Sequence, residues 1–234
     1  MAARLQAMGN VRYESGFAVT LHHDLVDAPR SWKAPRVVFV NSMSDLFHKR
    51  VPDSYIAKVV LTMHLARWHT YQVLTKRSGR LKGLLSGAFS EAAAEAHIWW
   101  GVSVENKKHG LPRIADLQNS PAAVRFLSVE PLLEDLGTLP LEGISWVIVG
   151  GESGPGARPM EEIWVLSIQQ QCEDAGVPFF FKQWGGVRKK IHGRTLQGRT
   201  HSEYPHRVSH PTLPMVARKQ YALEIEGSSL VQLT

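Results

Sequence analysis

The segment Ile98-Trp99-Trp100-Gly101-Val102-Ser103-Val104-Glu105-Asn106 shows the unit from which this chain is built. Its first five residues form a short, continuous apolar run, and a polar cluster follows directly. A helical pattern comes next, with Leu111, Ile114 and Leu117 at helical spacing. A short run rich in β-branched and aromatic residues is typical of a strand buried on both faces of a parallel sheet. The segment therefore predicts one strand–loop–helix unit.

The same unit recurs on both sides of this segment. Further apolar runs cover residues 37–40, 70–74, 124–127, 146–149 and 177–181. Helical patterns lie between most of them, although the stretch 81–96, rich in small residues, gives no clear pattern. Strands that alternate with helices predict parallel βα units with right-handed crossovers. We therefore expect an α/β fold, a partial parallel barrel of the TIM type with about six visible strands. A first strand, ahead of the initial helix, is expected to be missing.

Three parts of the chain are expected from these patterns. Residues 1–34 form an N-terminal helix and a connector, residues 35–186 form the barrel core, and residues 187–234 form a basic C-terminal appendage. The chain is 44% hydrophobic and 21% charged, which excludes a mostly disordered protein. A length of 234 residues suffices for one barrel domain.

Compartment and partners are predicted from the same composition. No apolar run approaches the roughly 20 residues of a membrane-spanning helix, and the N-terminus lacks the layout of a secretory signal. A single cysteine excludes an internal disulfide and suits a reducing compartment. We expect a cytoplasmic protein without a membrane partner. The net charge of +6, concentrated near the C-terminus, indicates either a solvated basic tail or a nucleic-acid partner.

Polar side chains follow each predicted strand, at the carboxyl ends where ligands bind in parallel βα folds. Period-two alternation places Ser103 with Glu105, and Ser128 with Glu130, on one side of the chain. Together with Asp45 and Glu152 these make four carboxylates, opposed by Lys76, Arg77 and Lys182. Carboxylates brought together out of water need cations, protons or a metal. The alternative is that single carboxylates cap helices or form surface salt bridges.

The glycine-rich loop 150–156 follows a strong strand. Glycines allow close backbone approach, so its N–H groups are candidates to hold a carboxylate, a phosphate or a ribose. The spacing matches neither the dinucleotide fingerprint nor the P-loop, and glycine also simply makes turns. Cys172 lies within a predicted helix, and no histidine pair has zinc-protease spacing. No catalytic residue and no metal ligand are therefore assigned.

The strand-end motifs together resemble a known family. They are Phe39-Val40-Asn41-Ser42-Met43-Ser44-Asp45-Leu46-Phe47-His48, Leu74-Thr75-Lys76-Arg77, Gly101-Val102-Ser103-Val104-Glu105-Asn106, Phe126-Leu127-Ser128-Val129-Glu130-Pro131-Leu132-Leu133, Val149-Gly150-Gly151-Glu152-Ser153-Gly154 and Phe180-Phe181-Lys182-Gln183-Trp184-Gly185-Gly186. The chain is similar, over about residues 1–205, to an uncharacterised family of phage and prophage proteins of unknown function. Complete members resemble radical S-adenosylmethionine (SAM) enzymes. They carry a first strand and a cysteine cluster ending in Cys-Tyr-Ala ahead of the point where this chain starts.

The resemblance implies a [4Fe–4S] cluster and SAM as cofactors, with residues 143–152 as the adenine-side strand. The implied cofactor-binding residues are Asn41, Ser42, Asp45, Ser103, Glu105, Ser128, Glu130, Gly150, Gly151 and Glu152. The implied substrate-binding residues are Lys76, Arg77, Lys182 and Gln183, for a small-molecule or macromolecular substrate. The cluster needs several Cys thiolates, whereas Cys172 is the only cysteine. We therefore expect the chain as written to hold neither cofactor and to be inactive, through a misplaced start or a real truncation.

Two other functions remain open from the residues alone. Clustered carboxylates also suit a hard cation, which predicts a Mg²⁺-dependent barrel hydrolase. The basic C-terminal stretch 187–234 suits a non-catalytic phage protein that binds nucleic acid.

Overall fold

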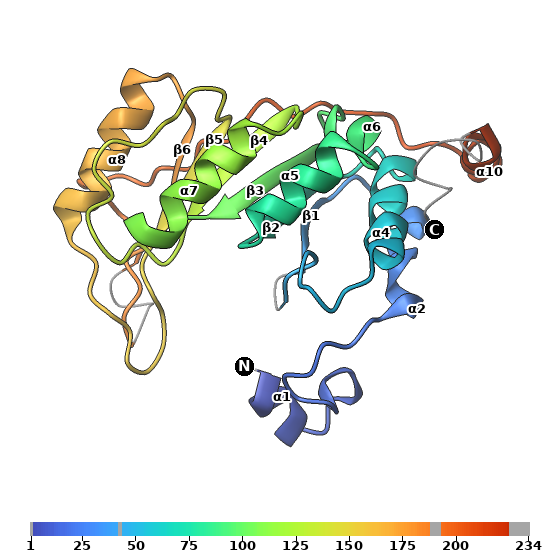
Figure 1. Cartoon of the computed structure of the whole chain (residues 1–234), viewed down its shortest axis with the longest axis horizontal. Helices are drawn as coiled ribbons and strands as arrows, with labels where there is room; N and C mark the ends of the chain where they lie inside the picture. Colours follow the sequence, from blue (N-terminus) through green and yellow to red (C-terminus); the bar gives the residue numbers. More distant parts are fainter. Residues whose placement is uncertain (1, 42–43, 188–192, 225–234) are drawn as a thin grey trace.

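Figure 1 shows the computed structural model of the chain, which describes residues 2–41, 44–187 and 193–224. Its centre is one sheet whose neighbouring strands are all parallel and follow the order β1-β2-β3-β4-β5-β6. The sheet curls into a half-barrel, so the predicted α/β partial parallel barrel is confirmed. The strands are β1 (Val37–Val40), β2 (Thr70–Thr75), β3 (Ile98–Ser103), β4 (Val124–Val129), β5 (Trp146–Gly150) and β6 (Phe179–Gln183).

The helices that follow the strands pack on the outer face of this sheet (Figure 1). Those of the barrel are α4 (Asp53–Leu65), α5 (Ser78–Ser86), α6 (Ser90–Ala93), α7 (Lys107–Gln118) and α8 (Glu162–Asp174). The flanking ones are α1 (Ala2–Ala7), η1 (Val11–Tyr13), α2 (His23–Val26), α3 (Ala28–Ser31) and α10 (Met215–Glu224). Among the described residues, none of the helices has both the length and the apolar composition needed to cross a lipid bilayer.

The two faces of the sheet carry different apolar clusters, because side chains alternate along each strand. Trp100 and Val147 point to the outer face and belong to the main core under the helices. Trp99, Phe126 and Trp146 point to the inner face and form a second, aromatic cluster. Both clusters are buried, which explains why the strands read as continuous apolar runs.

Gly101 in β3 leaves room for this inner cluster. A Cβ atom at this position would lie 2.4 Å from the Phe126 ring, far closer than van der Waals contact allows. The absence of a side chain therefore lets the Phe126 ring lie across β3.

The two edges of the half-barrel differ. Beyond β6, residues 201–203 run antiparallel to the strand, with hydrogen bonds from Phe181 N to His201 O (3.1 Å) and from Glu203 N to Phe179 O (3.2 Å). At the other edge, Val37 and Phe39 of β1 are 43% and 45% exposed. The C-terminal segment thus protects one edge from water and from unwanted strand pairing. The division of the chain at residues 34 and 186 stays a prediction.

Candidate functional site at the carboxyl ends of the strands

Asp45, in the loop after β1, holds the loops after β1 and β2 together. Its carboxylate accepts hydrogen bonds from Thr75 Oγ1 (2.7 Å), Lys76 N (3.0 Å) and Phe47 N (2.9 Å). It also pairs with Arg77 Nη1 at 2.6 Å. Asp45 is therefore satisfied within the protein, and it fixes the position of the Arg77 guanidinium.

Glu105, just after β3, has two cationic partners. Its carboxylate is 2.6 Å from Arg113 Nη1 and also pairs with Lys76 Nζ. Burial raises the pKa of Glu105, but the hydrogen bonds from Lys76 and Arg113 outweigh burial and hold the pKa below its ordinary value. The residue is only 7% exposed, yet its two cationic partners keep it ionised inside the protein.

Glu130 lies at the end of β4, beside Lys182 of β6. Its carboxylate is 3.0 Å from Lys182 Nζ and accepts a hydrogen bond from Ser128 Oγ at 3.1 Å. A Cβ atom on Gly150 would lie 2.7 Å from Glu130 Oε1, so glycine at the end of β5 makes space for this carboxylate. The Lys182 side chain is 54% exposed, whereas that of Glu130 is 17% exposed. The pair therefore presents its cation to solvent.

Glu152, in the glycine-rich loop, pairs with Arg158 at 2.7 Å. The side-chain and backbone hydrogen bonds from Arg158 lower the pKa of Glu152 to about 2. This pair lies at the surface, because the Arg158 side chain is 58% exposed.

The loop after β5 pairs with the chain after β6. Gly151 N donates to Gln183 O (2.9 Å), and Gly154 N donates to Gly186 O (3.2 Å). A Cβ atom on Gly151 would lie only 1.9 Å from Trp184 O. Backbone packing therefore requires a glycine at 151, and backbone carbonyls occupy two of the N–H groups that are candidates for ligand binding.

The structure brings the sequence-predicted residues to one edge of the half-barrel. Ser103 and Ser128 lie on the inner face of the sheet, in register with each other, and Glu105 and Glu130 follow them. The Gln183 side chain donates to Ser153 Oγ (2.6 Å) and joins the two loops beyond β5 and β6. Ser42 lies outside the described residues. The binding roles of these residues stay predictions.

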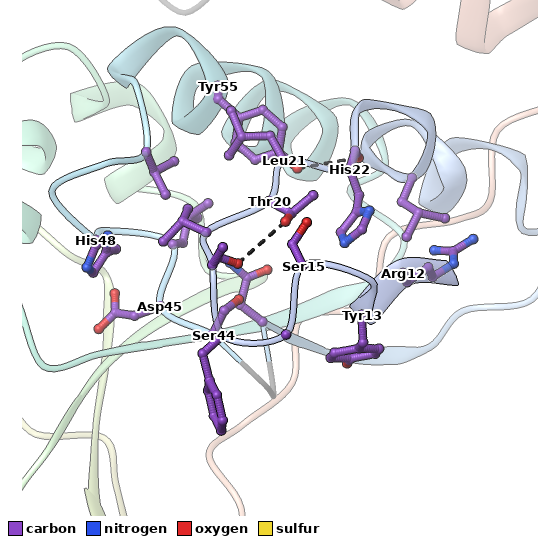
Figure 2. Close-up of a pocket in the computed structure, with 18 of the residues that line it drawn as sticks. Arg12, Tyr13, Ser15, Thr20, Leu21, His22, Ser44, Asp45, His48 and Tyr55 are labelled. Atoms are coloured by element: carbon purple, nitrogen blue, oxygen red, sulfur yellow. Dashed lines mark hydrogen bonds between the residues drawn. The ribbon is translucent and has the colours of Figure 1, made fainter. Parts of the chain in front are cut away.

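A cavity of about 660 Å³ adjoins this edge at the end of β1. Figure 2 shows it between the N-terminal segment, which contributes Tyr13 and Thr20, and the loop after β1, which contributes Asp45 and His48. Asn41 and Arg77 also line it, whereas the other predicted site residues lie along the edge beyond it. Tyr55 closes the far wall, where its hydroxyl donates to His22 O at 3.4 Å.

The residues of this chain do not fit an iron–sulfur cluster. Cys172 is completely buried in α8, and burial raises the pKa of its thiol to about 12. A thiol of this kind is neither ionised nor accessible to iron. Within the described ranges there is also no group of three His, Cys, Asp or Glu side chains arranged to hold a metal ion.

Sequence reasoning missed three contributors to the site. Arg113 is the second partner of Glu105, and Arg158 is the partner of Glu152. Residues 12–22 form one wall of the cavity. The position of Arg113, about two turns beyond the asparagine-capped start of α7, was a usable signal, whereas nothing in the pattern of residues 12–22 indicates a wall.

Comparison with known proteins gives one match. The family described as Protein of unknown function (DUF5131) matches residues 1–205. No curated protein and no solved structure matches the chain.

Proposed function

The chain belongs to the DUF5131 family of proteins of unknown function, and on that premise we propose that it is a radical-SAM-like barrel protein of phage or prophage origin. In this proposal the strand-end residues bind SAM and a substrate at the carboxyl edge of the half-barrel. The proposal keeps the expectation that the chain holds no iron–sulfur cluster, and it departs from the expectation that the chain also holds no SAM. The cytoplasm is its proposed location, because a lone cysteine suits a reducing compartment.

The observation that carries this proposal is the Glu130–Lys182 pair. SAM brings an ammonium, a carboxylate, a sulfonium and two ribose hydroxyls, so a pocket for it needs both carboxylates and cations. Glu130 offers a largely buried carboxylate 3.0 Å from a cation that is 54% exposed. A solvent-exposed ion pair is weak, so Lys182 can exchange its contact with Glu130 for a ligand carboxylate at little cost.

The other strand ends extend the same set of groups. Ser103 and Ser128 place hydroxyls on the inner face, and the absence of a side chain at Gly150 makes room for the Glu130 carboxylate. In this proposal Glu130 binds the ribose hydroxyls or the ammonium, and Lys182 binds the carboxylate of SAM. Bound SAM supplies the reactive sulfonium. No step through an iron–sulfur cluster is derived, because the residues of this chain do not fit one.

Titration calorimetry with SAM tests the proposal. We expect saturable binding to the wild-type protein, and a loss of about tenfold or more in affinity for Glu130→Gln, because a charge-assisted hydrogen bond contributes about 1.5–3 kcal/mol. Glu173→Gln is the matched control, since Glu173 is an exposed glutamate on α8. S-adenosylhomocysteine, which lacks the sulfonium charge, should bind more weakly than SAM.

Two results would contradict the proposal. One is no heat of binding up to about 1 mM SAM, an affinity of only about −4 kcal/mol. The other is equal affinity in wild type and Glu130→Gln. The Mg²⁺-dependent hydrolase stays a prediction that no observation favours, because Asp45, Glu105, Glu130 and Glu152 each have a cationic partner already.

A further inference from the structure

A second hollow, of about 480 Å³, lies beside the cavity, where the loop after β1 meets the start of α5. Its walls carry four cationic side chains and a histidine, and none of its lining residues is acidic. They are Phe47, His48, Lys49, Lys76, Arg77, Ser78, Gly79 and Arg80. A concave surface lined by one sign of charge concentrates ligands of the opposite sign.

The cationic side chains of this hollow differ in their partners and in their exposure. The Arg80 guanidinium donates to the carbonyls of His48 and Val51, each at 2.7 Å, and pairs with Asp53, so it holds the loop in place. Lys76 and Arg77 have internal carboxylate partners, yet their side chains are 50% and 42% exposed. Lys49 is exposed and forms no ion pair with any residue that the structure describes. The hollow therefore keeps positive charge available to a ligand.

The backbone at the start of α5 adds donors to the same surface. The first N–H groups of a helix have no partner within the helix. Gly79 is exposed, and an added Cβ would meet only Asp116 Oδ2, at 3.8 Å, which leaves its backbone open on the solvent side. These groups reinforce the preference of the cationic walls for an anion.

The hollow continues into the cavity of Figure 2, because His48 and Arg77 line both. The cavity wall beyond them carries Tyr13 and Phe17, and Phe17 is 81% exposed. An anion site next to an exposed aromatic ring suits a phosphate that is attached to a base, since bases stack on aromatic side chains.

Positive charge also extends past the hollow along the edge of the half-barrel. Lys107 and Lys108 are exposed at the start of α7, on the loop whose Glu105 pairs with Lys76. Cations thus lie on the loops after β1 and β2 and at the start of α7, which follow three neighbouring strands. Cations that follow three neighbouring strands offer more positive charge than a single phosphate requires, which suits a polyanion such as a polynucleotide.

We propose that single-stranded nucleic acid binds along this edge, with a phosphodiester in the hollow and a base against Phe17. The inference rests on the proposed function in one respect, because it names a substrate class for the carboxyl edge where that function places SAM and its substrate. It also differs from binding through the basic C-terminal stretch, because the charges involved are on the strand-end loops.

Fluorescence anisotropy with a labelled single-stranded oligonucleotide, titrated at low and moderate salt, tests this inference. The test variant is Lys49→Gln/Lys108→Gln, for which we expect about tenfold weaker binding and a shallower dependence on salt, since phosphate contacts are lost. The matched control is Lys58→Gln/Lys219→Gln, which removes the same charge from exposed positions on α4 and α10. It should change binding by less than about twofold, because charges that touch no phosphate release no counterions.

Two further variants test where the oligonucleotide binds. Phe17→Ala should weaken binding by about fivefold or more, because it removes a stacking surface. Arg199→Gln/Arg207→Gln removes two exposed charges from the C-terminal segment and should behave as the control does. Equal losses in the control and test variants, or a larger loss in the C-terminal variant, would overturn the proposed site. Unchanged binding in Phe17→Ala would overturn the placement of the base.

The outcome is separable from that of the SAM experiment. Lys49→Gln/Lys108→Gln should bind SAM as the wild type does. Oligonucleotide binding that depends on Lys49 and Lys108, in a protein that binds no SAM, would support this inference and contradict the proposed function. SAM binding by a protein that binds no oligonucleotide would overturn this inference and leave the proposed function standing.

Discussion

The two ends of the half-barrel both carry carboxylates among basic side chains, but they are built differently. At the amino ends of the strands, Glu95 lies between two imidazoles, with its oxygens 3.2 Å from His64 Nδ1 and 3.3 Å from His97 Nδ1. His97 is completely buried, and its Nε2 is 3.0 Å from Met63 O. His64 also contacts the hydroxyl of Tyr221 on α10 at 3.2 Å. This cluster therefore connects α4, the segment just before β3 and the C-terminal helix α10 inside the protein.

At the carboxyl ends, each carboxylate is largely buried or lies against the protein, while at least one of its cationic partners faces solvent. Lys76, Arg77 and Lys182 have side chains that are 50%, 42% and 54% exposed. A half-exposed cation can change its partner at little cost, whereas a buried pair cannot lose one member without leaving an uncompensated charge. Contacts between a carboxylate and basic side chains thus hold the fold together at one end and leave the other end open to ligands.

The largest effect on stability is expected at the amino end, from Glu95→Gln. The imidazoles of His64 and His97 hold the pKa of Glu95 below its usual range, against the opposing effect of burial. Removing this charge should lower the free energy of unfolding by about 3 kcal/mol, as measured by urea unfolding at neutral pH. Glu91→Gln, an exposed neighbour on α6, is the control. A loss below about 1 kcal/mol would mean that the contacts of Glu95 contribute no more than an exposed surface ion pair does.

An intermediate effect is expected from Glu105→Gln at the carboxyl end. The variant should lose about 1–2 kcal/mol, because Arg113 keeps its hydrogen bond to Ser103 O (2.7 Å) and Lys76 reaches water. Because the folded pKa of Glu105 is lowered, its ionic stabilisation is present above the unfolded pKa, about 4.3, and is lost as the pH falls. The difference between wild type and variant should therefore shrink between pH 7 and pH 3. A difference that does not vary with pH would show that the charge is not the cause.

The smallest effect is expected from Glu152→Gln. Its partner Arg158 is 58% exposed, and a pair of this kind is screened by salt. Urea unfolding at physiological salt should give no measurable change in the free energy of unfolding. A loss in the free energy of unfolding equal to that of Glu105→Gln would mean that the exposed Glu152–Arg158 pair stabilises the fold as much as the buried Glu105 does, which would contradict the expected difference.

Much of the architecture is already present in local sequence. The run 98–102 predicts a buried parallel strand, because a strand that is buried on both faces shows no alternation of polar and apolar residues. In the structure β3 begins at the same residue, Ile98. The helix after it was also expected, from the spacing of Leu111, Ile114 and Leu117. The period-two relation of Ser128 to Glu130 correctly indicated that both side chains lie on one side, where they form a hydrogen bond.

Only the tertiary structure decided which groups meet. Glu130 and Lys182 are 52 residues apart, and they pair because two crossovers return β4 and β6 to the same edge. Gly151 has to be a glycine because the backbone at Trp184 passes 1.9 Å from its Cβ position, which no local pattern contains. Strand and helix periodicity depends on neighbours in sequence, so it can be read directly from the chain. Pairing, burial and cavity walls depend on the path of the whole chain, so they appear only when the sheet has closed into its half-barrel.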